Sequence, residues 1–335
     1  MPELRYNIVT REWVIIAIER ARRPEEFARH GPQRTEPFPA HVGTCPFCPG
    51  NEHLTPPEMF RIARNGAWQV RVVPNKFPAL DAQGELVRRS TGLKRTISGV
   101  GMHEVIIETP AHNRPLALLS EEEVSLVVQT YYHRYGALTA DPRIAHATLF
   151  RNHGLRAGTS LQHPHSQVVG TPIIPPQVRE RMEGALRFYD EAGDCIICSV
   201  MADELGDQAR IVAQNSDFVA FVPFAALSPF HVWIFPLRHT ASFLETRESE
   251  LASLARMLRI VLRKIHFGLS DPDYNLTLRT PPREAHGSKY FHWYVSVIPR
   301  VTPVAGFELG SGMFINVAPP EQSATFLRNT PADPS

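Results

Sequence analysis

Apolar and polar positions along the chain follow two periods, which predict strands alternating with two long helices. Apolar side chains at Val124, Val127, Val128 and Tyr131 have helical spacing and predict a helix from about Ser120 to Leu138. The run Ser-Glu-Glu-Glu that opens it is a capping-box pattern. Further apolar runs predict a second helix over residues 248–266 and strands over residues 69–73, 103–107, 145–150, 218–222, 231–235 and 274–279.

The order of these elements is repeated, which indicates an internal duplication. Each half begins with a C-x-x-C pair and continues with two strand-like runs, a histidine, a long helix, a strand and a second histidine motif. The interval between the two histidines is nearly the same in both halves. We therefore expect an α+β fold of two duplicated units, each an antiparallel sheet with helices packed on it. The expected units are residues 1–178, which carry the chemistry, and residues 185–330, which are catalytically degenerate.

All four cysteines fall in the two C-x-x-C pairs, and each pair has two matching histidines. A tetrahedral zinc site takes four Cys or His ligands and leaves no open position, so both sites are expected to be structural. The alternative is a redox pair, which normally opens a helix after a strand. The prolines around the first pair favour a tight turn and hence zinc. The two predicted ligand sets are Cys45, Cys48, His112 and His163, and Cys195, Cys198, His239 and His292.

The candidate catalytic residues are His165 and Gln167, which share a strand face with His163 because side chains alternate along a strand. Neutral imidazole is a nucleophile near pH 7, so His165 can attack phosphorus if its other ring nitrogen is held as N–H. Gln167 can donate its amide N–H to a phosphate oxygen. Pro164 cannot donate a ladder hydrogen bond, which predicts an edge or bulged strand. The alternative role for His165 is a further zinc ligand or a core histidine. The second half has Tyr294 at the matching position, so only one half is expected to be chemically competent.

A polar loop upstream of the histidines is the candidate phosphate-binding element. It contains Asn152, Arg156, Gly158, Thr159 and Ser160, which can offer amides, hydroxyls and a guanidinium to phosphate oxygens. Phosphate recognition is expected to be local, because the net charge of the 335 residues is only +1. Nucleic acid is therefore not an expected partner. The sequence also has no apolar run of membrane-spanning length and no signal-peptide pattern at its start, which predicts a cytoplasmic protein without a membrane partner.

Several motifs along nearly the whole chain resemble the galactose-1-phosphate uridylyltransferase family, within the histidine-triad superfamily. The resemblance implies histidine-triad-like units and a ping-pong mechanism with a nucleotidyl-His165 intermediate. It also implies nucleotide contacts from Arg20, Arg23, Asn75 and the loop from Asn152 to Ser160, and hexose contacts around Phe307 and Glu308. The motifs that carry it are residues 10–16 (TREWVII), 20–24 (RARRP), 45–51 (CPFCPGN), 110–112 (PAH), 152–158 (NHGLRAG) and 163–167 (HPHSQ).

The second half departs from the best-known members of that family. Their hexose-contacting run begins with a lysine, whereas the matching stretch here, residues 302–308, reads TPVAGFE. Residues 222–226, 291–293 and 306–310 instead resemble the branch that includes ADP-glucose phosphorylase. The leading expectation is transfer of a nucleoside monophosphate from UDP-glucose to a hexose 1-phosphate.

Three alternatives stay open at this point. They are AMP transfer from ADP-glucose to phosphate, hydrolysis, and a non-catalytic zinc-stabilised nucleotide-binding protein. Hydrolytic histidine-triad proteins commonly carry a third histidine where this chain has Gln167, and glutamine cannot act as a general acid. The expected small-molecule partners are a nucleotide sugar and a sugar 1-phosphate or phosphate, with a homodimer as the expected assembly.

Overall fold

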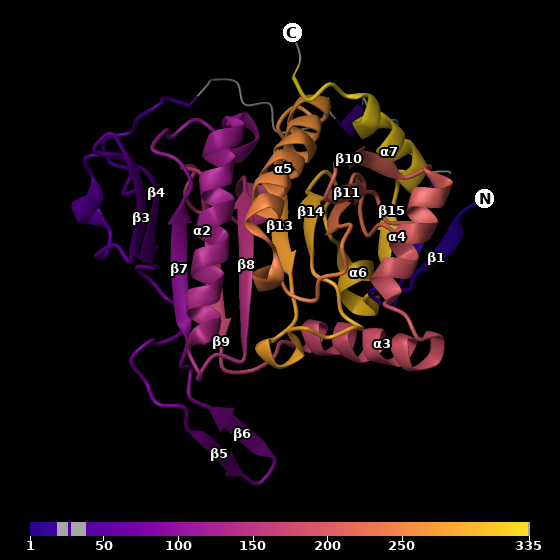
Figure 1. Cartoon of the computed structure of the whole chain (residues 1–335), viewed down its shortest axis with the longest axis horizontal. Coiled ribbons are helices and arrows are strands. Elements are labelled where there is room, and N and C mark those ends of the chain that lie inside the picture. The colour runs from indigo at the N-terminus through magenta and orange to yellow at the C-terminus, as the bar shows by residue number, and fades with distance from the viewer. Residues whose placement is uncertain (19–25, 28–37, 334–335) are drawn as a thin grey trace.

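The computed structural model describes residues 1–18, 26–27 and 38–333. Within these residues the main body is one mixed α+β unit built on a ten-stranded antiparallel sheet, with the order β10-β11-β12-β14-β13-β8-β9-β7-β4-β3 (Figure 1). The sheet strands are β3 (Phe60–Arg64), β4 (Ala67–Pro74), β7 (Met102–Ile107), β8 (His146–His153), β9 (His165–Thr171), β10 (Ile211–Gln214), β11 (Phe218–Phe221), β12 (Val232–Pro236), β13 (Tyr274–Arg279) and β14 (Tyr294–Pro299).

The sheet order confirms the expected duplication. Read from its two outer strands inward, the first half contributes β3-β4-β7-β9-β8 and the second half contributes β10-β11-β12-β14-β13 in the same relative order. The halves join where β8 pairs with β13, from Tyr274 opposite His153 to Thr277 opposite Phe150. The α+β class is therefore confirmed, and the halves share one continuous sheet. The domain boundaries, 1–178 and 185–330, stay a prediction.

Two long helices, α2 (Glu121–Ala140) and α5 (Glu248–Gly268), lie side by side on one face of the sheet (Figure 1). Both begin and end within two residues of the predicted bounds. The predicted capping box is present in α2, where Ser120 accepts from the amide of Glu123 and the Glu123 carboxylate accepts from the amide of Ser120. Their apolar stripes bury a common core against the strands, in which Val128, Leu258 and Val168 are no more than 2% exposed.

The opposite face of the sheet carries the cysteine pairs and the histidine motifs. Over the second half it is covered by α3 (Pro176–Ala192) and α4 (Ile196–Asp207). Strand β9 begins at His165, directly after Pro164, and lies between β7 and β8 in the sheet. The prediction of an edge or bulged strand was therefore wrong, because the proline precedes the ladder and removes no hydrogen bond from it.

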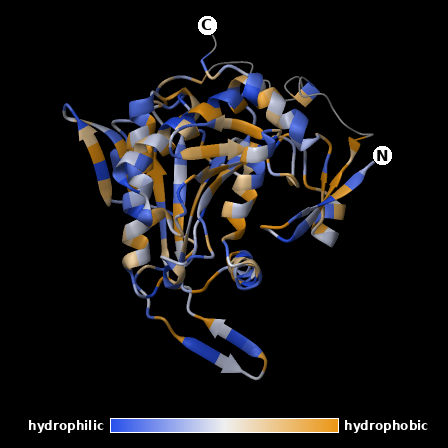
Figure 2. Ribbon diagram, turned by 45° about the vertical axis from the view of Figure 1, so that its right-hand side comes forward, coloured by the Kyte–Doolittle hydropathy of each residue, from blue (hydrophilic) through white to orange (hydrophobic). Residues whose placement is uncertain are grey.

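The remaining elements lie around this sheet. A small sheet has the order β1-β2-β15, and a basic hairpin, β5 with β6, projects from the body with mostly hydrophilic residues (Figure 2). No helix among the described residues is both long and apolar enough to cross a membrane. The bounds are β1 (Glu3–Asn7), β2 (Glu12–Ile16), β5 (Arg88–Thr91), β6 (Lys94–Ile97), β15 (Phe314–Asn316), α6 (Gly306–Ser311) and α7 (Pro320–Asn329).

Candidate functional site

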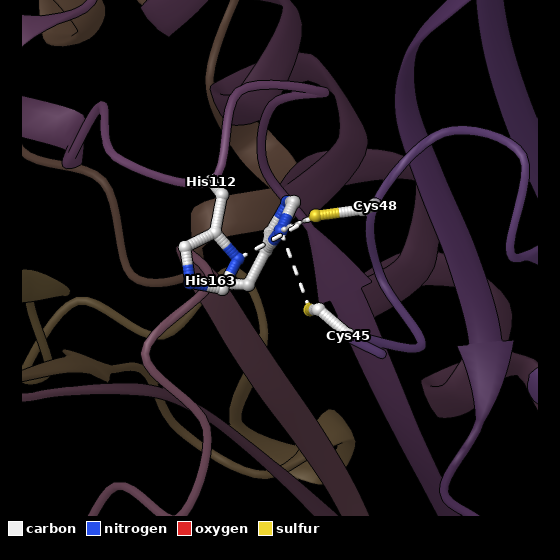
Figure 3. A group of neighbouring side chains, drawn as sticks. All are labelled: Cys45, Cys48, His112 and His163. Atoms are coloured by element: carbon white, nitrogen blue, oxygen red, sulfur yellow. Dashed lines mark hydrogen bonds between the residues drawn. The ribbon is translucent and has the colours of Figure 1, made fainter. Parts of the chain in front are cut away.

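The first predicted ligand set forms a buried cluster beside the start of β9 (Figure 3). The ligand atoms of Cys45, Cys48, His112 and His163 all lie within 4.8 Å of one another. The Cys48 sulfur is 3.5 Å from Nδ1 of His112 and 3.6 Å from Nδ1 of His163. His163 donates from Nε2 to the carbonyl of Thr109 at 2.8 Å, which leaves Nδ1 free as a ligand. Two sulfurs and two imidazole nitrogens at these separations fit a tetrahedral metal ion.

The second ligand set forms an equivalent cluster in the other half. The ligand atoms of Cys195, Cys198, His239 and His292 also lie within 4.8 Å of one another. A tight turn presents the first cysteine pair only. In the second pair Cys195 is the N-cap of α4 and Cys198 lies in the first turn of that helix. The two clusters share their ligand types but differ in the backbone that presents the thiols. Both can bind a metal ion.

His165 lines a cavity of about 340 Å³ at the start of β9. Its Nδ1–H donates to the carbonyl of His163 at 2.8 Å, so the lone pair is on Nε2. Burial lowers the pKa of His165 below its ordinary value, against the opposing effect of the hydrogen bond to His163. The ring of Phe47 packs edge-on against the imidazole, with 5.4 Å between centroids. His165 is thus an oriented imidazole with a free Nε2, and the backbone fixes the tautomer that nucleophilic attack would require.

A buried charged network lies on the other side of β9, beneath His165. The carboxylate of Glu108 accepts from Arg151 at 3.0 Å, from Tyr131 at 2.8 Å and from the hydroxyl of Ser166. Burial alone would raise the pKa of Glu108, but the Arg151 guanidinium and these hydrogen bonds outweigh it and hold the pKa below its usual range. The network ties β7, β8, β9 and α2 together. Sequence reasoning missed it, since its members are far apart and no spacing connects them.

The predicted phosphate loop lies along the same cavity. Asn152, Arg156, Thr159 and Ser160 line it together with His165. Gly158 has a left-handed backbone, with φ at +89°, and closes the turn of the loop without contributing to the wall. The loop thus lies beside His165 as expected, and its phosphate-binding role stays a prediction.

Residues of the second half hold this loop in place, which the sequence did not reveal. Asp273 accepts from the backbone amide of Arg156 at 2.7 Å. Asn275 donates to the side-chain oxygen of Asn152 at 2.8 Å and to the carbonyl of Ala157 at 2.9 Å. Gly154 is required at its position, because a Cβ there would lie 1.8 Å from a carboxylate oxygen of Asp273. The β8–β13 pairing thus makes the second half a support for the pocket of the first.

Gln167 and Asn75 meet through a histidine that the sequence analysis did not assign. His103 on β7 lies with its Nε2 2.8 Å from Oε1 of Gln167 and 3.1 Å from Nδ2 of Asn75. Gln167 shares the site face of β9 with His165, as predicted, but neither Gln167 nor Asn75 lines the His165 cavity. The only signal for His103 was its place at the start of a strand that pairs with β9.

The remaining predicted residues lie elsewhere. Phe307 and Glu308 belong to α6, and Glu308 lines a different cavity from His165. Arg20 and Arg23 fall outside the described residues. The substrate-contacting roles of all these residues stay predictions.

The fold and this site fit a class of enzymes that transfer a phosphorus group, because they present a buried histidine whose tautomer is fixed by its own backbone. Comparison with known proteins identifies the family. Residues 1–175 match the family model for the N-terminal domain of galactose-1-phosphate uridyl transferase. The chain therefore belongs to the galactose-1-phosphate uridylyltransferase family, and it is a nucleotidyltransferase of that type.

Individual relatives match over nearly their whole length. An ADP-glucose phosphorylase from Arabidopsis thaliana is 35% identical, with 98% of this chain and 92% of the relative covered. A galactose-1-phosphate uridylyltransferase from Thermotoga maritima is 30% identical over 98% of this chain and 99% of the relative. A crystal structure of an Arabidopsis thaliana ADP-glucose phosphorylase with bound ADP-glucose superposes with a TM-score of 0.83, at 31% identity, covering 99% of each chain. These relatives are enzymes, which argues against a non-catalytic binding protein.

Proposed function

We propose that the enzyme transfers a nucleoside monophosphate from UDP-glucose to a hexose 1-phosphate through a covalent intermediate on His165. The Nε2 lone pair of His165 attacks the α-phosphorus, the P–O bond to the sugar phosphate breaks, and hexose 1-phosphate leaves with the electron pair. A second hexose 1-phosphate then attacks the phosphorus and releases the imidazole. The observation that carries this proposal is the hydrogen bond from His165 Nδ1 to the carbonyl of His163, which directs reactivity to Nε2.

The polar residues of the site have electrostatic and positioning roles in this proposal. Gln167 accepts from His103 with its oxygen and has its amide N–H groups left to donate to a non-bridging oxygen. Asn152, Gly158, Thr159 and Ser160 contact the phosphate. In the same proposal Asn75, Arg20 and Arg23 contact the nucleotide, and Phe307 and Glu308 contact the hexose.

We also infer that both Cys₂His₂ clusters bind zinc, which gives two structural ions per chain. The donor set of two thiolates and two imidazoles supports this assignment, since Zn²⁺ prefers sulfur and nitrogen ligands in a tetrahedral arrangement. Zinc here would connect each cysteine pair to the segment that leads into the strand after the second histidine. In the first half the ligand His163 directly precedes Pro164 and lies two residues before His165. A cytoplasmic homodimer, with units 1–178 and 185–330, completes the proposal.

AMP transfer from ADP-glucose to phosphate is the second candidate, and a specific observation favours it. The Arabidopsis ADP-glucose phosphorylase matches at 35% identity, against 30% for the Thermotoga uridylyltransferase. The stretch 302–308 also lacks the lysine of the best-known uridylyltransferases. Both candidates use the same chemistry at His165 and differ in base and acceptor.

One experiment tests the chemistry and separates the two candidates. The zinc-loaded enzyme is incubated with UDP-glucose or with ADP-glucose, and the intact protein is weighed for a UMP or an AMP adduct. A UMP adduct supports the leading proposal, and an AMP adduct that phosphate discharges supports the second. A phosphoramidate on His165 must be labile in acid, whereas an ester on Ser160 or Ser166 would survive. An acid-stable adduct, or an adduct that persists in His165→Ala, would overturn both.

A further inference from the structure

A cavity of about 240 Å³ has three arginines in its wall and lies apart from the His165 cavity. We call it the arginine cavity. Arg181 comes from α3, Arg279 ends β13 and Arg300 follows β14. Ser228 and Glu12 also line it, as does Glu308, which the proposed function places against the hexose. Among the described residues it shares no lining residue with the His165 cavity.

The cationic groups of this cavity lack the partners that half-buried arginines usually have. Nη1 of Arg181 is buried without a hydrogen-bond partner, and so is the hydroxyl of Ser228. The guanidinium of Arg279 makes no hydrogen bond or ion pair with any residue that the structure describes. Only Arg300 is engaged, through Nε to the side-chain oxygen of Asn275 at 2.5 Å. Clustered, unpaired guanidinium groups repel one another and keep unsatisfied donors, and a bound anion relieves both costs.

The electrostatics agree with this geometry. Burial and then the charge of Arg181 lower the pKa of Arg279 to about 10, which is unusual for a guanidinium. The pKa of the neighbouring buried His231 falls to about 3, first through burial and then through Arg279, Arg181 and Arg300. The charges of all three arginines therefore act on one small region. The Glu12 carboxylate acts on Arg279 from a distance but forms no ion pair with it among the described residues.

The internal duplication shows what this cavity corresponds to. Thr277 pairs with Ser296 in the second half as Phe150 pairs with Gln167 in the first. Two residues further along the strands lie Arg279 and Asn152. Arg279 therefore occupies the position from which Asn152 lines the His165 cavity. The second half has lost the nucleophile at this place and has gained positive charge.

We propose that the arginine cavity binds a phosphoryl group, carried by inorganic phosphate or by a sugar phosphate. Arginine presents donors in a planar fork that matches phosphate oxygens, and the cavity is large enough for a small phosphate ester. The unpartnered oxygen of Glu12 can accept a hydroxyl of a sugar but has no role toward free phosphate. A bound anion is connected to the active site by hydrogen bonds, from Arg300 to Asn275 and from Asn275 to Asn152.

The test is equilibrium dialysis of the full-length, zinc-loaded protein against radiolabelled inorganic phosphate and, separately, glucose 1-phosphate. Arg279→Gln and Arg181→Gln should each weaken binding in the arginine cavity by at least about tenfold, the loss expected for a charge-assisted hydrogen bond. His165→Ala should leave binding in the arginine cavity unchanged. The matched control is Arg187→Gln on the same helix, which removes an exposed arginine and should change nothing. If glucose 1-phosphate is the better ligand, Glu12→Gln should remove its advantage over phosphate.

Thermal unfolding separates binding from a structural role. Without phosphate, Arg279→Gln should unfold at the same temperature as the wild type or higher, because it removes an unpaired charge. Phosphate should raise the unfolding temperature of the wild type more than that of the variant. The proposal is overturned if phosphate binding is the same in the wild type, Arg279→Gln and Arg181→Gln. It is equally overturned if Arg279→Gln lowers the unfolding temperature by the same amount with and without phosphate.

Discussion

Replacing Asn275 by alanine tests whether the second half shapes the active site of the first. Its side chain donates to Asn152 at 2.8 Å and to the carbonyl of Ala157 at 2.9 Å, and it accepts from Arg300 at 2.5 Å. At about 1 kcal/mol for each hydrogen bond, the substitution should lower the free energy of unfolding by about 2–3 kcal/mol. The loop that it releases contacts the substrate phosphate in our proposal. A misplacement of about 1 Å there can slow the reaction about 10²-fold.

The assay compares adduct formation on His165 with thermal or denaturant unfolding. Asn215→Ala is the matched control, because Asn215 also makes three side-chain hydrogen bonds, to Ser253, Asp217 and Phe218, in a loop of the second half. Both variants should lose similar stability, but only Asn275→Ala should slow adduct formation. Asn275→Asp keeps the acceptor for Arg300 and loses both donations, so it should also be slow. Equal rates in Asn275→Ala and the wild type would refute the idea that this residue positions the loop.

The remaining predictions concern metal, the amide at the site and acid. Metal analysis should find two zinc ions per chain, and Cys45→Ser or Cys195→Ser should each lose one ion and destabilise the fold; a metal-free, fully folded protein would contradict this. Gln167→Ala should slow adduct formation by roughly 10²–10³-fold in rapid-quench measurements, without loss of zinc. Burial lowers the pKa of His146 to about 4 and that of His231 to about 3, so the unfolded state takes up protons that the folded state refuses. Stability should therefore be unaffected above pH of about 6.5 and fall below it, by about 2 kcal/mol for each histidine at pH of about 5. His146→Gln should flatten this dependence in denaturant titrations, and an unchanged slope would count against the buried neutral state.

The metal-type clusters and the place of His165 beside one of them were predictable because their signals are local or repeated. Cys45 and Cys48 lie on one turn, His163 and His165 lie two residues apart, and the second half repeats the pattern with His292. A set of Cys and His residues that occurs twice at matching spacing indicates a common site rather than chance. The helix positions could also be predicted from a local signal, because a few turns of sequence are enough to show the apolar period of an amphipathic helix.

The supporting residues could not be predicted, because they depend on which strands become neighbours. Glu108, Arg151 and Asp273 read as ordinary charged residues in the sequence. They acquire their roles when β7, β8 and β13 come together, and the pairing of β8 with β13 leaves no trace in hydrophobic periodicity. The predicted edge position of the strand that contains Gln167 was wrong for a related reason. The prediction treats Pro164 as part of the strand ladder, whereas the ladder begins one residue later, at His165.

The pairing of β8 with β13, which joins the two halves, explains why the second half can remain part of the fold although it has Tyr294 where the first half has His165. Without a partner, β8 would be the edge of a five-stranded sheet, with unpaired backbone groups beside the loop that lines the His165 cavity. β13 pairs with that edge, and Asp273 and Asn275 from it hold the loop. Support of the loop requires β13 and the strands that pair with it, but it does not require a histidine at the position of Tyr294. Selection for the β8–β13 pairing can therefore preserve the second cysteine cluster and the core of the second half. The residue at position 294 is not constrained in this way. The same freedom allows Arg279 to stand where the first half has Asn152.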